Sequence, residues 1–222
     1  MDKKTIAAMI DHTLLKPEAT PAQIEKLCAE AAEYHFASVC VNPVYIPLAA
    51  RLLKGTGVKV CCVVGFPLGA IAPEQKAAEA ASCAAMGAEE LDMVIHVGAA
   101  KAGDWALVQR DIEGVVKAAA GHTVKVIIET CLLTDEEKEK MCDIVCEAGA
   151  DYIKTSTGFS TAGANFHDVE LMVKGVHGRC KVKAAGGIST VEDMETFLAL
   201  GADRLGTSRA VKILNGEQAK GY

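Results

Sequence analysis

The sequence predicts an α/β fold in which eight parallel strands alternate with helices and close into a barrel. Short apolar runs rich in Val and Ile alternate with longer segments of helical period, and there are eight such runs. Most are apolar at successive positions, as strands are when both faces are covered. This alternation requires parallel strands with right-handed crossovers, and each strand-helix unit has roughly 28 residues. The closed fold that these units predict is a compact (β/α)8 TIM barrel.

The strands are expected in the following order along the chain: His12 to Leu15, Ser38 to Val41, Val58 to Val64, Leu91 to Ile95, Val124 to Ile128, Tyr152 to Lys154, Lys181 to Lys183 and Arg204 to Leu205. An open doubly wound sheet is the alternative architecture. Its Gly-x-Gly-x-x-Gly fingerprint is absent after the first strand, which favours the barrel.

Helix starts are indicated by capping sequences between the strands. Thr20-Pro21-Ala22-Gln23, Thr134-Asp135-Glu136-Glu137 and Ser189-Thr190-Val191-Glu192 are read as capping boxes, and Asn42-Pro43 opens a further helix. Helix ends carry a weak repeat in which Gly can adopt the left-handed conformation and a strand follows almost at once. Its three copies are Met86-Gly87-Ala88-Glu89, Ala148-Gly149-Ala150-Asp151 and Leu200-Gly201-Ala202-Asp203.

Composition limits the classes of function. The chain has 222 residues, of which 50% are hydrophobic and 23% charged, with a formal net charge of −6, so we expect one globular domain over residues 1–222 with a flexible tail at 215–222. Acids and bases are mixed along the chain, which argues against a nucleic-acid surface.

No apolar run approaches the ~20 residues of a membrane span, and the first residues resemble no signal peptide, so we expect a cytoplasmic protein. The nine cysteines form no paired framework and no zinc spacing, and are interpreted as reduced thiols.

Three ionisable residues stand inside or at the end of apolar strands, where a barrel builds its active site: Asp92, Lys154 and Lys183. Burying such groups costs several kcal/mol unless they are paired or change their charge state. Lys154 and Lys183 belong to neighbouring strands and should lie side by side. Because like charges and burial both disfavour an ammonium ion, at least one of the two lysines should have a lowered pKa and act as a free amine toward a carbonyl group.

Three loops rich in Gly, Ser and Thr follow the sixth, seventh and eighth strands: 155–160, 185–189 and 206–209. The last two precede helices, so backbone N–H groups and helix dipoles can converge on one anion there. Many barrels carry a phosphate site at this place. The loops beside the lysine pair therefore predict a phosphorylated carbonyl substrate.

Seven segments of the chain resemble the signature segments of the deoxyribose-phosphate aldolase family, and they occur in order over nearly the whole chain. Lys-Thr-Ser-Thr-Gly is the most specific of them. The segments are Ile10 to Pro17, Val39 to Pro43, Gly65 to Gly69, Leu91 to Val94, Val126 to Thr130, Ile153 to Gly158 and Lys183 to Gly187.

The resemblance implies an aldolase without a cofactor or a metal that reversibly cleaves 2-deoxy-D-ribose 5-phosphate into D-glyceraldehyde 3-phosphate and acetaldehyde. By motif, Lys154 is the Schiff-base nucleophile, Lys183 the lysine that tunes it and Asp92 the partner in proton transfer. The family pattern also implies phosphate binding at Gly158, Gly186, Gly187, Gly206 and Ser208. The partners implied are small phosphosugars and aldehydes, with a homo-oligomer expected and neither nucleic acid nor membrane.

Some positions depart from the family pattern or add auxiliary groups. Arg209 stands where a second Ser is frequent, and we favour a phosphate contact. His96 stands where Asn is usual and is expected to hydrogen-bond a loop. Tyr222 ends the chain, as a tyrosine does in relatives where it is thought to reach the active site. Cys40 is interpreted as a packing thiol near the pocket, and Asp11 and Thr13 as supporting groups.

Two alternatives remain open from sequence. One is another Schiff-base barrel enzyme, of transaldolase or hexulose-phosphate aldolase type, with the same lysine and phosphate site but a different substrate. The other is a catalytically silent barrel that only binds phosphosugars. The intact set of Asp92, Lys154 and Lys183 argues against the silent barrel.

Overall fold

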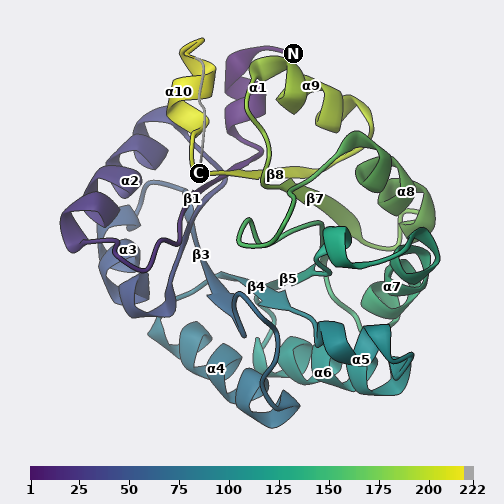
Figure 1. Ribbon diagram of the computed structural model, residues 1–222. Coiled ribbons are helices and arrows are strands. Elements are labelled where there is room, and N and C mark those ends of the chain that lie inside the picture. The colour runs from purple at the N-terminus through teal and green to yellow at the C-terminus, as the bar shows by residue number, and fades with distance from the viewer. Residues whose placement is uncertain (218–222) are drawn as a thin grey trace.

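The eight predicted strands form one closed parallel barrel in the computed structural model, which describes residues 1–217. The strand order β1-β2-β3-β4-β5-β6-β7-β8 follows the sequence, and β1 pairs with β8 to close the ring. Helices surround this ring, as Figure 1 shows in a view into the barrel. The barrel prediction is confirmed, and the open doubly wound sheet is excluded because no sheet edge is left between β1 and β8.

The strand bounds lie within two residues of the predicted ones. They are β1 Ile10–Leu14, β2 Ser38–Val41, β3 Lys59–Val64, β4 Glu90–Val94, β5 Thr123–Ile127, β6 Tyr152–Lys154, β7 Lys181–Ala185 and β8 Arg204–Thr207. The earlier start of β1 matters for the site. Asp11 becomes its second residue and points its carboxylate into the barrel cluster described below, whereas the predicted strand begins one residue after it, at His12.

The helices and 3₁₀ turns that cover the barrel are α1 Lys3–Ala7, α2 Pro21–Tyr34, η1 Pro43–Tyr45, α3 Ile46–Leu53, α4 Pro73–Met86, α5 Val97–Lys101, α6 Trp105–Ala118, η2 Thr130–Leu132, α7 Asp135–Glu147, α8 Phe166–Val176, α9 Val191–Ala199 and α10 Ala210–Leu214. Apolar side chains of these helices and of the outward faces of the strands form one large core between the two layers. No helix among residues 1–217 is both long and apolar enough to cross a membrane.

The capping predictions hold in part. Thr20 and Thr134 each form a full capping box at the starts of α2 and α7. The third box is shifted by one residue, since Thr190 is the N-cap of α9 and Asp193 its partner, in place of Ser189 and Glu192. Asn42 does precede a helical turn, but this turn is the 3₁₀ segment η1 and Asn42 donates its side chain to the Leu15 carbonyl.

The helix-stop repeat has a second function in the fold. Its glycines all adopt positive φ, as predicted: Gly87 at 109°, Gly149 at 80° and Gly201 at 106°. The acidic residue two positions later bonds twice to one residue of the preceding strand. Asp203, for example, donates its amide to the Val182 carbonyl and accepts the Val182 amide at 2.9 Å.

Glu89 makes the same pair of bonds with Val60, and Asp151 with Val124. Each repeat therefore extends the strand pairing by one residue at the amino end of the barrel and satisfies an amide that would otherwise need water.

The first residues of the predicted flexible tail are ordered. The Asn215 amide bonds to Val211, and the Glu217 amide bonds to Lys212, so both continue the end of α10. The remaining tail residues, Tyr222 among them, lie outside the described residues.

Substitution of Gly201 by Ala is expected to destabilise the protein more than the same substitution at Gly103. Both glycines have positive φ, which costs an L-residue about 1–2 kcal/mol. A Cβ at Gly201 would also lie 2.9 Å from a Val173 methyl group, whereas one at Gly103 would meet open space. Urea unfolding of the two variants measures the difference, and equal losses would show that the contact with Val173 relaxes freely.

Candidate active site

The three residues singled out as catalytic meet inside the barrel. Asp92 is the third residue of β4, Lys154 the last of β6 and Lys183 the third of β7. One carboxylate oxygen, Asp92 Oδ2, lies 2.7 Å from the Nζ atom of Lys154 and 2.7 Å from that of Lys183. All three side chains are buried, and Lys154 and Lys183 are paired across neighbouring strands as the order of the strands predicted.

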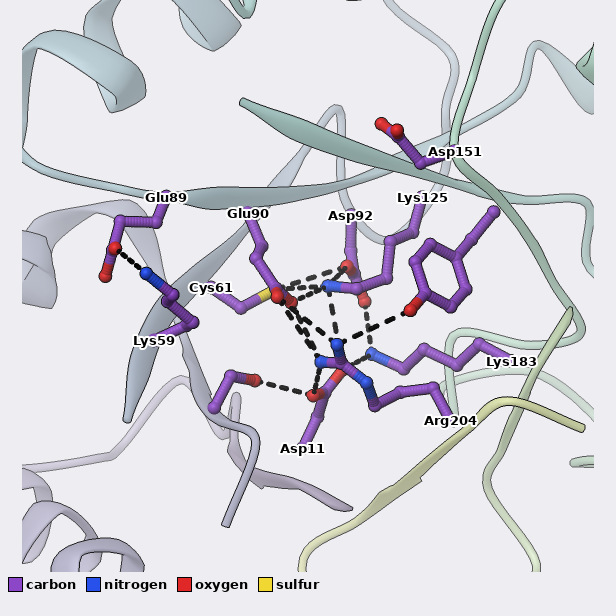
Figure 2. Close-up of polar contacts among 12 residues, drawn as sticks. Asp11, Lys59, Cys61, Glu89, Glu90, Asp92, Lys125, Asp151, Lys183 and Arg204 are labelled. Atoms are coloured by element: carbon purple, nitrogen blue, oxygen red, sulfur yellow. Dashed lines mark hydrogen bonds and ion pairs between the residues drawn. The ribbon is translucent and has the colours of Figure 1, made fainter. Parts of the chain in front are cut away.

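The cluster continues toward the amino end of the barrel, where Glu90 and Arg204 are the first residues of β4 and β8. Figure 2 shows these residues together with Asp92 and Lys183. Lys125 of β5 donates to Asp92 Oδ1 at 2.8 Å and pairs with Glu90 at 2.6 Å. Figure 2 shows it between these two acids. Arg204 of β8 pairs with Glu90 at 3.0 Å and with Asp11 at 2.6 Å. Lys125, Glu90 and Arg204 were not predicted from the sequence as site residues.

Asp11 joins the two halves of the cluster. Its Oδ2 atom accepts a short hydrogen bond from Lys183, and its Oδ1 atom accepts one from Ser38 at 2.7 Å. The supporting role expected for Asp11 therefore has a defined form: it contacts Lys183 directly.

The charges in this cluster nearly balance. Four cationic side chains, those of Lys125, Lys154, Lys183 and Arg204, face three carboxylates, those of Asp11, Glu90 and Asp92. Full ionisation would leave one positive charge in excess in a largely buried cluster, and the loss of one proton would leave none.

The acids of the cluster are held ionised. Burial by itself would raise the pKa of Asp92, but the ammonium groups of Lys125, Lys154 and Lys183 lower it by more, so this pKa lies well below its ordinary value. Burial likewise opposes ionisation of Asp11, and Lys183, Lys125 and Arg204 together bring the pKa of Asp11 far below its ordinary value.

Lys183 behaves differently from the simple picture of two repelling ammonium groups. Burial alone would lower its pKa, but Asp11 and Asp92 raise it by more, so the pKa of Lys183 lies above its ordinary value. Lys183 is therefore not the amine that gives up its proton. Two carboxylates, those of Asp11 and Asp92, contact Lys183, and the prediction from two repelling ammonium groups did not include them.

A depression opens at the carboxyl ends of the strands, directly above the cluster. Lys154 lines it, and so do all five residues that the family pattern assigns to phosphate. The full lining consists of Thr13, Leu15, Lys154, Thr157, Gly158, Ala185, Gly186, Gly187, Gly206, Thr207, Ser208 and Arg209. Lys183 and Asp92 lie beneath it and are not part of the lining.

The glycines shape this depression. Gly158, Gly186 and Gly187 have φ values of 84°, 76° and 76°, a conformation that favours glycine. A Cβ at Gly206 would lie 3.1 Å from Lys183 Cε, so a side chain there would press on the lysine. The Gly186 amide donates to the Gly206 carbonyl at 3.3 Å, which joins the two loops.

Glu129, which lies in the signature segment Val126 to Thr130 but had no predicted role, fixes the loop that carries Gly158. It follows β5 in the left-handed conformation, with φ at 55°, and its buried carboxylate accepts the amide of Thr157 at 3.2 Å and its hydroxyl at 2.5 Å. A left-handed non-glycine residue is strained, and the two bonds to the loop offset that cost.

The auxiliary residues divide into those near the depression and those elsewhere. Thr13 and Arg209 line it, and Arg209 also donates to the Ile188 carbonyl at 2.9 Å. Cys40 packs in a small apolar cluster with Leu15 and Phe66 among others, as a packing thiol would. His96 accepts the Ala99 amide at 3.0 Å and caps α5, so its hydrogen bond goes to the first turn of a helix and not to the loop that was expected.

Two groups of acids, thiols and imidazoles lie close enough to share a metal ion within the described part of the chain. One is Cys40, Cys61 and Asp92, and the other is Asp135, His167 and Asp168. In each group a lysine already pairs with a carboxylate: Lys125, Lys154 and Lys183 surround Asp92, and Lys138 lies 2.7 Å from Asp168. Ammonium groups in these positions repel a divalent cation, so neither set fits a metal well.

Comparison with known proteins agrees with this geometry. A family model described as DeoC/LacD family aldolase matches residues 5–209. The chain belongs to this family. A relative from Geobacillus sp. (strain WCH70), named deoxyribose-phosphate aldolase, is 57% identical over 218 residues, which cover 98% of this chain and 98% of the relative. One of the same name from Clostridium perfringens (strain SM101 / Type A) is 55% identical and covers 98% and 97%.

A solved structure agrees as well. The structure described as the unique tetrameric structure of deoxyribose phosphate aldolase from Aeropyrum pernix superposes with a TM-score of 0.91 at 38% identity, covering 97% of this chain and 92% of that one. The membership in the DeoC/LacD aldolases thus extends over the barrel, the buried lysines and the loops above them.

The stability of this DeoC/LacD aldolase is expected to fall as the pH drops below about 4. The pKa values of Asp11 and Asp92 are lowered in the folded state, whereas unfolded carboxyls titrate near 3.9, so the unfolded chain binds more protons below that pH. The two carboxylates contribute fully to the free energy of unfolding above the unfolded-state pKa. This contribution is lost as the pH falls toward their folded-state pKa values. Urea unfolding from pH 6 to pH 3 tests this.

A Glu113→Gln variant is the control for this titration, because Glu113 is exposed on α6 and bonds only to Gln109 among the described contacts. Its pH dependence should match that of the parent chain. Stability that stays flat down to pH 3 would contradict the buried, charge-paired state of Asp11 and Asp92.

Proposed function

We propose that this chain reversibly cleaves 2-deoxy-D-ribose 5-phosphate into D-glyceraldehyde 3-phosphate and acetaldehyde, through an imine on Lys154. The names of its relatives support this substrate. The observation that carries the proposal is the shared oxygen: Asp92 Oδ2 contacts both lysine Nζ atoms at 2.7 Å, directly beneath a glycine-lined depression.

Lys154 is the nucleophile in this proposal. It lines the depression, whereas Lys183 lies beneath it, so its amine is the one a substrate can reach. Lys183 and Lys125 each contact two or more carboxylates, and Lys154 contacts Asp92 alone among the described ion pairs. Releasing the proton of Lys154 removes the excess positive charge and leaves every carboxylate with a cationic partner.

The reaction then follows from the imine. The Lys154 amine adds to C1 of the open-chain sugar, and loss of water gives a protonated imine. The C3 hydroxyl group loses its proton, the C2–C3 bond breaks, and the electron pair moves to the iminium nitrogen, which gives an enamine and D-glyceraldehyde 3-phosphate. Protonation of the enamine at C2 and hydrolysis by one water release acetaldehyde and restore Lys154.

Asp92 and Lys183 serve proton transfer in this proposal. Asp92 Oδ2 contacts both nitrogens, so it is placed to receive the proton that leaves Lys154, whereas Lys183 already holds its own. Asp11 and Lys125 hold Lys183 and Asp92 in place, since Asp11 contacts Lys183 and Lys125 contacts Asp92. The raised pKa of Lys183 supports its role as the cation beside the imine.

The phosphate end of the substrate is proposed to lie on Gly158, Gly186, Gly187, Gly206 and Ser208. These residues line the same depression as Lys154, which leaves C1 at the lysine and C5 at the loops. The loop that contains Gly186 precedes α9, so the helix dipole adds to the attraction for an anion.

Two wider expectations accompany the proposal. The tetramer named for the Aeropyrum pernix relative supports a homo-oligomer. A cytoplasmic location remains an expectation from sequence. Another Schiff-base phosphosugar aldolase would use the same lysines, and analysis of the products from deoxyribose 5-phosphate distinguishes the two substrates.

Borohydride reduction in the presence of acetaldehyde should attach an ethyl group to Lys154. The imine forms only on an amine that is both unprotonated and accessible, and reduction makes the bond permanent. Peptide mass mapping locates the adduct. A Lys154→Ala variant should lose it together with the cleavage activity.

A Lys212→Ala variant, which removes an exposed lysine of α10, is the control and should keep the adduct at Lys154. An adduct on Lys183 in place of Lys154 would reverse the assigned roles. No adduct on either lysine, in a chain that folds, would remove the Schiff-base mechanism and favour a silent barrel.

An Arg209→Ser variant is expected to raise KM for the phosphorylated sugar by roughly 10- to 100-fold, because a hydrogen bond to a charged group contributes about 1.5–3 kcal/mol. KM for unphosphorylated 2-deoxyribose should change little. Lys212→Ser removes one positive charge nearby without touching the depression and serves as the matched control. Equal KM values in the parent and Arg209→Ser enzymes would show that Arg209 makes no phosphate contact.

A further inference from the structure

The thiols of Cys146 and Cys180 lie against each other at the amino end of the barrel. Their Sγ atoms are 2.8 Å apart, although the residues are 34 positions apart in sequence. Cys146 is in the last turn of α7, and Cys180 directly precedes β7. A disulfide bond has an S–S length of about 2.05 Å, so these sulfurs need to move by less than about 1 Å to form one.

The backbone around the two thiols is already held together. Arg179, next to Cys180, pairs with Asp143 of α7 at 2.6 Å, and its guanidinium group also donates to the Val176 and Gly175 carbonyls. The same two segments that a disulfide would join are thus joined by an ion pair. An unstrained disulfide needs backbone segments that are already held close together, because the bond tolerates little displacement of the backbone.

Small molecules can reach both thiols. Cys146 and Cys180 are partly exposed, and they line a depression between the amino ends of β5 to β8 together with Asp151, Lys181 and Arg204. Thiol contacts also join Cys62 to Cys83 and Cys40 to Cys61, but all four of those cysteines are buried. Exposure therefore distinguishes the pair of Cys146 and Cys180 from these internal pairs.

We propose that Cys146 and Cys180 are a reversible oxidation site that forms an intrachain disulfide with a peroxide as the oxidant. The thiolate of Cys146 attacks one peroxide oxygen and breaks the O–O bond, which gives a sulfenic acid and, with one proton, water. Cys180 then attacks this sulfur, and the S–O bond breaks to release a second water. Two thiols are oxidised by two electrons in total, and hydrogen peroxide is reduced to two waters.

The surroundings determine which thiol reacts first. Burial, together with the contact to Cys146, raises the pKa of Cys180, so Cys180 holds its proton more firmly and is the second thiol to react. This assignment makes Cys146 the thiol that meets the peroxide.

The disulfide would act on stability more than on catalysis. It closes a loop between α7 and β7, which restricts the unfolded chain and should raise Tm by about 5–10 °C. Lys183 is on β7, but three residues beyond Cys180, and its contacts to Asp11 and Asp92 lie inside the barrel. We therefore expect kcat to stay within about twofold of the reduced enzyme, since no group that contacts substrate moves.

The experiment compares the full chain after reduction and after treatment with hydrogen peroxide. Non-reducing peptide mapping should find the Cys146 and Cys180 peptides joined, and thermal unfolding should show the rise in Tm, both reversed by dithiothreitol. Cys146→Ser and Cys180→Ser variants should each lose the Tm shift. Cys131→Ser, which removes another partly exposed thiol, should keep it.

The mapping of the unmodified sequence tests the proposal even if a serine variant folds poorly. Disulfides between two chains, sulfinic acid at Cys146, or a crosslink that involves Cys131 would each overturn it. So would joined peptides whose formation leaves Tm unchanged, because the stabilising role would then be absent.

Discussion

The structure depends on a carboxylate, that of Asp92, buried inside the barrel among three lysines. A single acid cannot balance three ammonium groups, and the fold supplies Asp11 and Glu90 from β1 and β4 to share them. Removing any partner would leave a charge in a place without water, which costs several kcal/mol. The charged side chains of the cluster therefore depend on one another, and together they determine the charge state of each.

This charge cluster also explains why Lys154 and Lys183, which both contact Asp92, are proposed to have different roles. Lys183 lies between Asp11 and Asp92, and its pKa is raised, so it remains a cation at neutral pH. Lys154 reaches the opening and contacts Asp92 alone among the described ion pairs. A fixed cation beside an accessible amine fits the proposed imine mechanism, because the amine that a substrate can reach is not the one held between two carboxylates.

Much of this could be predicted from the chain. The eight strands and the meeting of Asp92, Lys154 and Lys183 follow from apolar strands interrupted by ionisable residues. Lys125 carries the same signal, since it stands between Val124 and Val126, and it could have been found in the same way. Glu90 and Arg204 could not, because each stands at the first residue of a strand, where a charge usually faces water. Only the closed barrel places them in one layer beneath Asp92.

The carboxyl end of the barrel forms the substrate depression, whereas contacts at the amino end stabilise the fold. At the carboxyl end, glycines in left-handed conformation keep side chains away from the opening, and Glu129 accepts strain to fix the loop around Gly158. At the amino end, the acids of the helix-stop repeat close the strand pairing, and Cys146 and Cys180 lie in contact beside them. A disulfide between Cys146 and Cys180 would therefore lie away from the reacting groups, because the buried charge cluster lies between the two ends of the barrel.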